Sequence, residues 1–452
     1  MVAMAHRSQQ RLLGLWANGL RVGTWQVAAN GEDRLTYDPV WLVSSQGRPL
    51  SLSLPFTIDN APLRGPQVRN YFDNLLPDSD VIRRRLQTRF RTSSTDAFDL
   101  LTAIGRDCVG AIQLLPEGEE PDDVFDIQAC PLNEAEIANA LRAATAAPLV
   151  LGQQQASDED FRISLAGAQE KTAFLWHHGQ WCRPVGSTPT THIFKLPLGL
   201  VGGRQADMRS SVENEWLCAQ ILRAFDLPVA NCEMARFEEQ KVLIVERFDR
   251  KLAAQSYWLR LPQEDFCQAT GKSPDAKYEA DGGPGVVDIA RILQLSEARE
   301  QDLRTLLTAQ LVFWMLAATD GHAKNFSIFL LPGGRYRLTP LYDVLSAWPV
   351  TGTGPNKLDV NRLKLAMAVR GKNTHHRLRD IQRRHFNHMA RLCGWGENMD
   401  DLIMDCLGRV PHVLEVVAQQ LPVEFPMEVF EAIELGMRES AKRLAAMPAT
   451  LL

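Results

Sequence analysis

The stretch Ala318-Thr-Asp-Gly-His-Ala-Lys-Asn325 decides how the chain folds, because it joins a predicted helix to a predicted strand. Residues 306–318 form a mostly apolar run of helical length, and residues 326–331 have the composition of a buried strand. A glycine pair at 333–334 then turns the chain back on itself. The returning strand leads to Asp343, so the hairpin predicts that this aspartate lies beside the quoted stretch.

Three polar residues of this region, Asp320, Asn325 and Asp343, occur in the order used for phosphoryl transfer. In protein kinases one aspartate orients the acceptor hydroxyl, while an asparagine and a second aspartate hold Mg²⁺ on the nucleotide phosphates. Such oxygen ligands suit Mg²⁺. The alternative is a polar loop that only caps a helix end. The pattern predicts Asp320 as the catalytic residue, with Asn325 and Asp343 as magnesium ligands.

A lysine upstream fits the nucleotide-binding half of such a site. Lys195 lies in an apolar strand predicted at 191–197, where a kinase places the lysine that pairs with phosphates. An edge lysine that extends its tip into solvent is the alternative. The next helix, predicted at 210–225 from a capping-box pattern, offers Glu213 or Glu215 as a partner.

Two further segments complete the predicted order of a kinase. The small-residue loop at 166–168 would let backbone amides approach phosphates, and residues 161–165 and 171–176 predict a hairpin around it. Residues 246–248 end a strand predicted at 241–248 and would present backbone groups to adenine. Each signal is weak alone, and the order of loop, lysine, hinge and paired acids makes the set coherent.

The N-terminal region predicts short strands followed by helices. Asn18-Gly19 between apolar runs favours a tight hairpin, and residues 50–54 alternate as a half-buried strand. Residues 71–101 are helical in pattern, and the acidic stretch 116–123 predicts a boundary. The chain beyond 288 is mostly helical, ending in amphipathic helices around 397–420 and 427–446.

Composition narrows the class of protein. The chain has 452 residues, 45% hydrophobic and 23% charged, with a net charge of −5, which excludes disordered, fibrous and disulfide-scaffold proteins. The eight cysteines lack CxxC or zinc-site spacing, so we expect reduced thiols. We expect a cytoplasmic protein without a signal peptide or a membrane partner.

One segment departs from this acidic average. Residues 362–391 contain nine basic residues and one acidic residue, Asp380. A solvated helical face and a surface for DNA phosphates explain this segment equally well.

Six ungapped runs resemble the HipA toxin kinases. They are Phe72–Asp78, Ile104–Gly110, Phe161–Lys171, Val245–Asp249, Arg260–Asp265 and Ala318–Asn325. The resemblance spans nearly the whole chain. It implies an α+β, two-lobed protein-kinase-like (phosphoinositide-kinase-like) fold with a β-rich N-terminal subdomain and a mainly helical C-terminal lobe. We expect a coupling subdomain at 10–120, nucleotide-binding elements at 150–255, and a helical lobe with the catalytic loop and the basic segment at 256–452.

The resemblance also implies ATP and Mg²⁺ as cofactors and assigns roles to individual residues. Asp320 matches the catalytic aspartate of the family. Ser164 matches the family's autophosphorylated serine, whose modification ejects the phosphate loop. Without the resemblance, Ser164 would be interpreted as an ordinary hydroxyl of a strand. Nucleotide contacts are implied at Ala166, Gly167, Ala168, Gln169, Glu170, Lys171, Lys195, Glu246, Arg247, Phe248, Gln263, His322, Lys324, Asn325, Tyr342 and Asp343. Arg391 stands where the family has a DNA-contacting lysine, with Arg383 and Arg384 as neighbouring candidates; the next family contact falls near the uncharged Gly394.

The implied function is a serine/threonine kinase toxin of a type II toxin–antitoxin pair. Family members phosphorylate a serine of glutamyl-tRNA synthetase, which inhibits translation and promotes persistence, although a different synthetase would satisfy the same residues. The implied partners are a dimeric helix-turn-helix antitoxin and, through it, the operator DNA of the operon that the pair represses. The competing hypotheses are a catalytically idle, DNA-bound corepressor and a small-molecule kinase.

Overall fold

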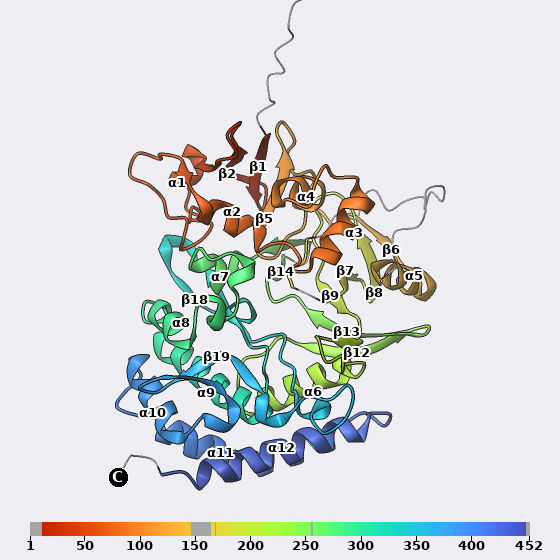
Figure 1. The fold of residues 1–452 in the computed structure, drawn as a ribbon. Coiled ribbons are helices and arrows are strands. Elements are labelled where there is room, and N and C mark those ends of the chain that lie inside the picture. The colour runs from red at the N-terminus through yellow and green to blue at the C-terminus, as the bar shows by residue number, and fades with distance from the viewer. Residues whose placement is uncertain (1–10, 146–163, 168, 255, 449–452) are drawn as a thin grey trace, which may run out of the picture.

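The N-terminal unit is an antiparallel sheet covered by short helices (Figure 1). The computed structural model describes residues 11–145, 164–167, 169–254 and 256–448. The sheet order is β4-β3-β2-β1-β5, with β1 Arg11–Ala17, β2 Leu20–Val27, β3 Asp33–Tyr37, β4 Leu63–Arg64 and β5 Ile112–Pro116. The helices are α1 Pro39–Val43, α2 Pro66–Asp73, α3 Asp80–Phe90 and α4 Ala97–Ile104. Trp25 stacks on Phe72 at 4.0 Å in the core.

The middle of the chain forms a six-stranded sheet with a helix on each face. Its order is β12-β13-β9-β7-β8-β6. The strands are β6 Ala129–Pro131, β7 Lys171–His177, β8 Gln180–Pro184, β9 His192–Lys195, β12 Cys232–Phe237 and β13 Gln240–Glu246. Because side chains alternate along a strand, Phe194 packs under α5 (Glu134–Thr145), whereas its neighbour Lys195 points to the other face, where α6 (Ser211–Ala224) lies.

The C-terminal lobe is mainly helical and holds the largest core. Helix α9 (Arg299–Leu316) is buried along most of its length. Around it lie α8 Val286–Leu293, α10 Arg383–Leu392, α11 Asp400–Gln419 and α12 Met427–Ala445, whereas the short α7 Phe266–Ala269 lies beside α2 of the N-terminal unit. A three-stranded sheet of this lobe faces the N-terminal unit; it consists of β16 Gln263–Asp265, β17 Ser327–Leu330 and β18 Tyr336–Leu338. Three two-stranded sheets complete the described structure. They are β10 Leu200–Val201 with β11 Ala206–Asp207, β14 Arg250–Ala253 with β15 Tyr257–Arg260, and β19 Lys364–Arg370 with β20 Thr374–Arg377. No helix among the described residues has the length and apolarity needed to cross a membrane.

Several local predictions are confirmed. Asn18 and Gly19 have φ of 48° and 82° and join β1 to β2, as an Asn-Gly turn requires. The strands predicted at 191–197 and 241–248 appear as β9 and β13. The predicted terminal helices correspond to α11 and α12.

Other local predictions are wrong. Residues 50–54 form a turn instead of a strand, because the Ser51 and Ser53 hydroxyls donate to the carbonyl of Gln268 at 3.1 and 2.7 Å. The hairpin predicted between 161–165 and 171–176 is not observed: Ser164 and Leu165 are not in a strand, and 161–163 lie outside the described residues. Strand β7 instead forms its hairpin with β8. The basic segment is only partly helical: strands β19 and β20 come first, and a 3₁₀ turn at Leu378–Asp380 and helix α10 follow.

Candidate active site

The catalytic loop follows a helix that ends abruptly inside the core. Helix α9 stops at Leu316, and Ala317 adopts a left-handed conformation with φ of 49°. After the loop, β17 and β18 pair so that Ile328 faces Leu338, one residue away from the register that the glycine turn predicts. The hairpin therefore carries the chain back to Asp343, which also has a positive φ of 60°.

Lys195 joins the two lobes through one ammonium group. Its Nζ lies 2.5 Å from Oε1 of Glu215 and 2.8 Å from Oδ1 of Asp343. Glu213, the other candidate partner, pairs with Lys241 at 2.6 Å instead. The predicted capping box of α6 does not form, since the Ser210 side chain makes no capping hydrogen bond in the described structure.

Burial and the nearby charges determine the pKa values of the two carboxylates, Glu215 and Asp343, that contact Lys195. Burial raises the pKa of Glu215 to about 7, and Asp343 adds to the increase although Lys195 opposes it. The pKa of Asp343 is lowered despite burial, because Lys195 and Lys171 stabilise its charged form. Asp343 therefore carries a full negative charge, as a magnesium ligand must.

Asp320 and Asn325 are the other two predicted residues of the loop. The Asn325 side chain accepts a hydrogen bond from the backbone N–H of His322 at 3.2 Å, which holds the loop closed. Asp320 is exposed, and its Oδ1 accepts a hydrogen bond from the Tyr278 hydroxyl at 2.6 Å. Tyr278 therefore occupies one of the two carboxylate oxygens of Asp320. Sequence reasoning missed this residue, because no local pattern connects it to the catalytic loop.

His322 is buried and faces the same tyrosine. Its ring packs edge-on against Tyr278, with centroids 5.1 Å apart, and its Nδ1 has no hydrogen-bond partner among the described residues. Burial lowers the pKa of this imidazole. The residue is therefore neutral near pH 7 and leaves one ring nitrogen for a ligand.

The predicted phosphate loop is held close to Lys171. Gly167 has φ of 108°, a backbone conformation that favours glycine, and the Lys171 Nζ lies close to its Cα. The ammonium group donates to the carbonyl of Ala166. The loop then joins the sheet, because the Leu196 N–H donates to the Glu170 carbonyl at 3.2 Å. Ala168 lies outside the described residues.

The charge of Lys171 gives a pH prediction. Burial, with repulsion from Lys195, lowers the pKa of Lys171 to about 8, although Asp343, Asp78 and Glu215 oppose the decrease. Because a lysine with a lowered pKa becomes neutral as the pH rises through that value, we expect the KM for Mg·ATP to increase above about pH 8. Lys171→Arg, which stays charged, is expected to flatten the profile in steady-state assays. An equal rise in Lys171→Arg would assign the effect to another group.

Tyr342, Phe248 and Gln263 are three further predicted nucleotide contacts. The Tyr342 hydroxyl donates to the Lys324 carbonyl at 2.8 Å, and the Phe248 ring lies 5.7 Å from the Tyr342 ring. Gln263 is buried, with its Oε1 unpartnered among the described residues. A small, partly open pocket adjoins Asp343 and is also lined by Glu215, Val229, Cys232, Val245 and Tyr342.

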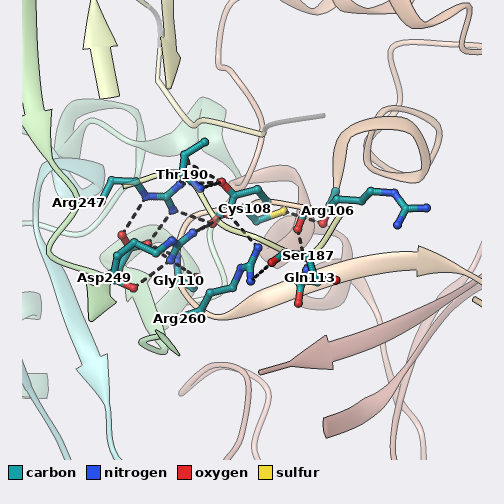
Figure 2. Close-up of polar contacts among 12 residues, drawn as sticks. Arg106, Cys108, Gly110, Gln113, Ser187, Thr190, Arg247, Asp249 and Arg260 are labelled. Carbon is teal, nitrogen blue, oxygen red and sulfur yellow. Dashed lines mark hydrogen bonds and ion pairs between the residues drawn. The ribbon is translucent and has the colours of Figure 1, made fainter. Parts of the chain in front are cut away.

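Arg247 of the predicted hinge has a different environment. Its guanidinium is buried and pairs with Asp249 at 2.9 Å and with Asp107 at 3.3 Å (Figure 2). Arg250 joins the same two aspartates, each at 2.9 Å, and the Arg260 Nη2 lies 3.5 Å from Asp107. This buried ionic cluster connects the N-terminal unit to the hinge, and sequence reasoning missed it.

Lys324 of the catalytic loop also contacts the N-terminal unit. Its Nζ lies 2.7 Å from Oδ1 of Asp78, and the Lys277 Nζ lies 2.8 Å from Oδ2 of the same carboxylate. The two lysines hold the pKa of Asp78 at about 2, against the effect of burial. Asp78 ends one of the six ungapped runs, Phe72–Asp78, and Asp107 lies within another, Ile104–Gly110. These runs are the sequence signal that could have identified both residues.

The donor set fits a magnesium nucleotide. Asn325 and Asp343 supply the hard oxygen ligands that Mg²⁺ prefers, and Lys171 and Lys195 supply cations for phosphates. Gly167 allows the backbone to approach, and the unpartnered His322 Nδ1 and Gln263 Oε1 are polar atoms without a protein partner in the described structure. These residues would hold ATP and Mg²⁺.

The candidate DNA contacts differ in accessibility. Arg383 is mostly buried and pairs with Asp400 at 2.7 Å. Arg391 is 60% exposed and lies 3.5 Å from the exposed Glu397. The Arg384 Nε lies 3.4 Å from the His385 Nε2. Of these three, Arg391 is the side chain most available to a partner.

Comparisons with known proteins identify the family and the fold. Residues 13–115 match the HipA N-terminal domain and residues 163–414 match the HipA-like C-terminal domain. The putative kinase Y4mE of Sinorhizobium fredii is 36% identical over 74% of this chain and 77% of its own length. The serine/threonine-protein kinase toxin HipA of Shewanella oneidensis is 29% identical over 66% of this chain and 67% of its own length. The solved structure of Shewanella oneidensis HipA, in complex with HipB and operator DNA, has a TM-score of 0.77 at 22% identity and covers 96% of this chain and 98% of its own. The two-lobed fold is therefore confirmed, and the chain belongs to the HipA family of toxin kinases.

Proposed function

We propose that this chain is an ATP- and Mg²⁺-dependent serine/threonine kinase toxin of a toxin–antitoxin pair. The observation that carries the proposal is the Lys195 ammonium group, which contacts Glu215 from α6 and Asp343 from the catalytic lobe at 2.5 and 2.8 Å. An idle corepressor has no need to keep this contact beside an intact Asp320 and Asn325. The structure thus favours an active kinase over the corepressor.

The residues divide the work of phosphoryl transfer. Asp320 orients the acceptor serine hydroxyl in line with the γ-phosphate and receives its proton, after the hydroxyl displaces the Tyr278 phenol. Lys195 and Lys171 hold phosphate oxygens, and Asn325 and Asp343 hold the metal. Magnesium, when bound, neutralises charge that develops on the phosphates. The product is a phosphoserine and ADP.

We propose the partners from the resemblance and from one surface. A relative of this fold was solved with HipB and operator DNA, and the exposed Arg391 supports a similar assembly here. Glutamyl-tRNA synthetase is the proposed protein substrate, with inhibition of translation and persistence as consequences. Such partners place the kinase in the cytoplasm. Co-purification with the antitoxin, and loss of operator binding in Arg391→Glu, would test the DNA contact.

Ser164 is the proposed site of self-inactivation. The side chain is fully buried, and its Oγ donates to the Leu75 carbonyl at 2.7 Å. A phosphate group with a charge of about −1.5 to −2 has no room at this position, so the modified segment has to leave it. Autophosphorylation would therefore remove the adjoining phosphate loop from the site.

Intact-mass spectrometry after incubation with Mg·ATP tests both proposals. We expect the initially unmodified wild-type protein to gain one phosphate, and Ser164→Ala to gain none. Equal gain in Ser164→Ala would place the modification elsewhere. A wild-type protein that starts unmodified and gains nothing would favour the corepressor. The mass measured before incubation shows whether the purified protein already carries the phosphate.

A further inference from the structure

The N-terminal unit contacts the phosphate loop at a point that the kinase chemistry described above does not explain. We propose that Asp78 is a positioning residue, which holds the phosphate loop and the catalytic loop together so that both can bind the nucleotide phosphates. This inference rests on the proposed kinase function, and it adds a residue from outside the two kinase lobes to the nucleotide site.

Asp78 contacts the phosphate loop through its backbone. Its N–H donates to the carbonyl of Gly167 at 3.1 Å, and the preceding Pro77 forms a parallel bridge with the same glycine. These contacts lie at the residue whose positive φ shapes the loop. The loop conformation therefore depends on where the segment between α2 and α3 is placed.

The carboxylate of Asp78 contacts the opposite lobe. One oxygen pairs with Lys324, between the catalytic aspartate and Asn325, and the other pairs with Lys277, next to the Tyr278 that contacts Asp320. The side chains of Lys324, Asp78 and Lys277 are only 4%, 10% and 14% exposed. Because these charges are nearly removed from water, each ammonium group depends on this carboxylate for compensation.

The N-terminal unit also holds both ends of the same loop. At the first end, the Ser164 N–H donates to the Asp107 carbonyl at 3.0 Å, and its hydroxyl donates to Leu75. At the other end, Arg85 of α3 pairs with Glu170 at 2.7 Å. The Asp78 contact lies between these two, so it is the central one of three attachments. It is also the only one of these three that continues into the catalytic loop.

The consequence is a prediction about nucleotide affinity rather than about the chemical step. Without the carboxylate, Lys277 and Lys324 repel each other and lose their fixed positions, and the loop loses its link to the catalytic lobe. Asp320 and Asn325 do not contact Asp78 in any described interaction, so the acceptor site keeps its groups. We therefore expect the KM for Mg·ATP to change much more than kcat.

Asp78→Asn is the decisive variant, because it keeps the size and the backbone N–H and removes only the charge. We expect the KM for Mg·ATP to rise about tenfold or more, with kcat within about threefold of wild type, and hydrogen exchange to accelerate in residues 164–171. Asp80→Asn is the matched control, since this exposed residue lies two positions further, in the first turn of α3, and is expected to match wild type.

A second variant keeps the proposal testable if Asp78→Asn folds poorly. Lys277→Met removes one of the two ion pairs and is expected to accelerate exchange in the same loop to a smaller extent. In the Lys277→Met background, Asp78→Asn is expected to raise KM by a smaller factor than it does alone, because the two residues share one interaction. Effects on KM that add fully would show that the Asp78–Lys277 ion pair does not carry the change.

The outcomes separate this inference from the proposed function. Unchanged KM and unchanged loop exchange in Asp78→Asn, in a protein whose wild type transfers phosphate, would overturn the inference and leave the kinase assignment standing. Faster loop exchange in Asp78→Asn, in a protein whose wild type transfers no phosphate, would uphold the positioning role of Asp78 and overturn the proposed activity.

Discussion

Asp320→Ala is expected to lower phosphotransfer by about 10²–10⁴-fold, because it removes the group that we propose orients the acceptor hydroxyl and takes its proton. The side chain is exposed, and its described hydrogen bond is to Tyr278, so the folded structure should persist. The measurement is incorporation of labelled phosphate at the proposed targets, Ser164 and purified glutamyl-tRNA synthetase, with thermal unfolding as the check on folding.

Tyr278→Phe is the matched control for this experiment. It removes the other half of the same hydrogen bond but leaves the carboxylate, so we expect activity to be retained. An Asp320→Ala protein that still transfers phosphate would contradict the catalytic assignment. Loss of activity in Tyr278→Phe as large as in Asp320→Ala would show that the hydrogen bond itself, and not the free carboxylate, is required.

Asp107→Ala is expected to lower the free energy of unfolding by about 3–5 kcal/mol, because it leaves buried charges without compensation. The carboxylate accepts hydrogen bonds from Arg250 at 2.9 Å and from the Thr190 hydroxyl at 2.7 Å. Arg247 and Arg260 lie within 3.5 Å of it. Urea unfolding followed by tryptophan fluorescence measures the change.

Asp405→Ala provides the control for the stability experiment. This residue on α11 is 46% exposed and lies 3.7 Å from Arg304, so its loss is expected to cost at most about 1 kcal/mol. Equal destabilisation by the two variants would contradict the importance assigned to the buried ionic cluster. The three arginines lower the pKa of Asp107 against the effect of burial, so its contribution is present above the unfolded pKa of about 3.9 and is lost on acidification.

Local sequence was sufficient where neighbours along the chain decide the structure. The glycine turn at 333–334 and the strands beside it predicted that Asp343 returns towards Asn325, and the observed pairing differs from the prediction by one residue. The apolar residues next to Lys195 similarly identified it as part of a strand, β9. A hairpin and a strand depend on contacts within a few residues, so composition and turn chemistry define them.

Local sequence failed where the partner lies far along the chain. Residues 50–54 alternate as a strand does, yet the hydroxyls of Ser51 and Ser53 bind Gln268 more than 200 residues away. The choice between Glu213 and Glu215 also needed the fold. Residues two apart on a helix point in different directions, and only the packing of α6 against β9 and β13 shows that Glu215 meets Lys195 while Glu213 meets Lys241.

The sequence by itself therefore determined the family, the order of the kinase elements and the loop with Asp320 and Asn325. Only the tertiary structure placed Asp78 on Lys277 and Lys324, and Asp107 among the hinge arginines. The physical reason is that an ion pair depends on distance in space. A buried charge is stable only where the fold brings a partner within a few ångströms. The spacing of residues along the chain does not indicate which residue that partner is.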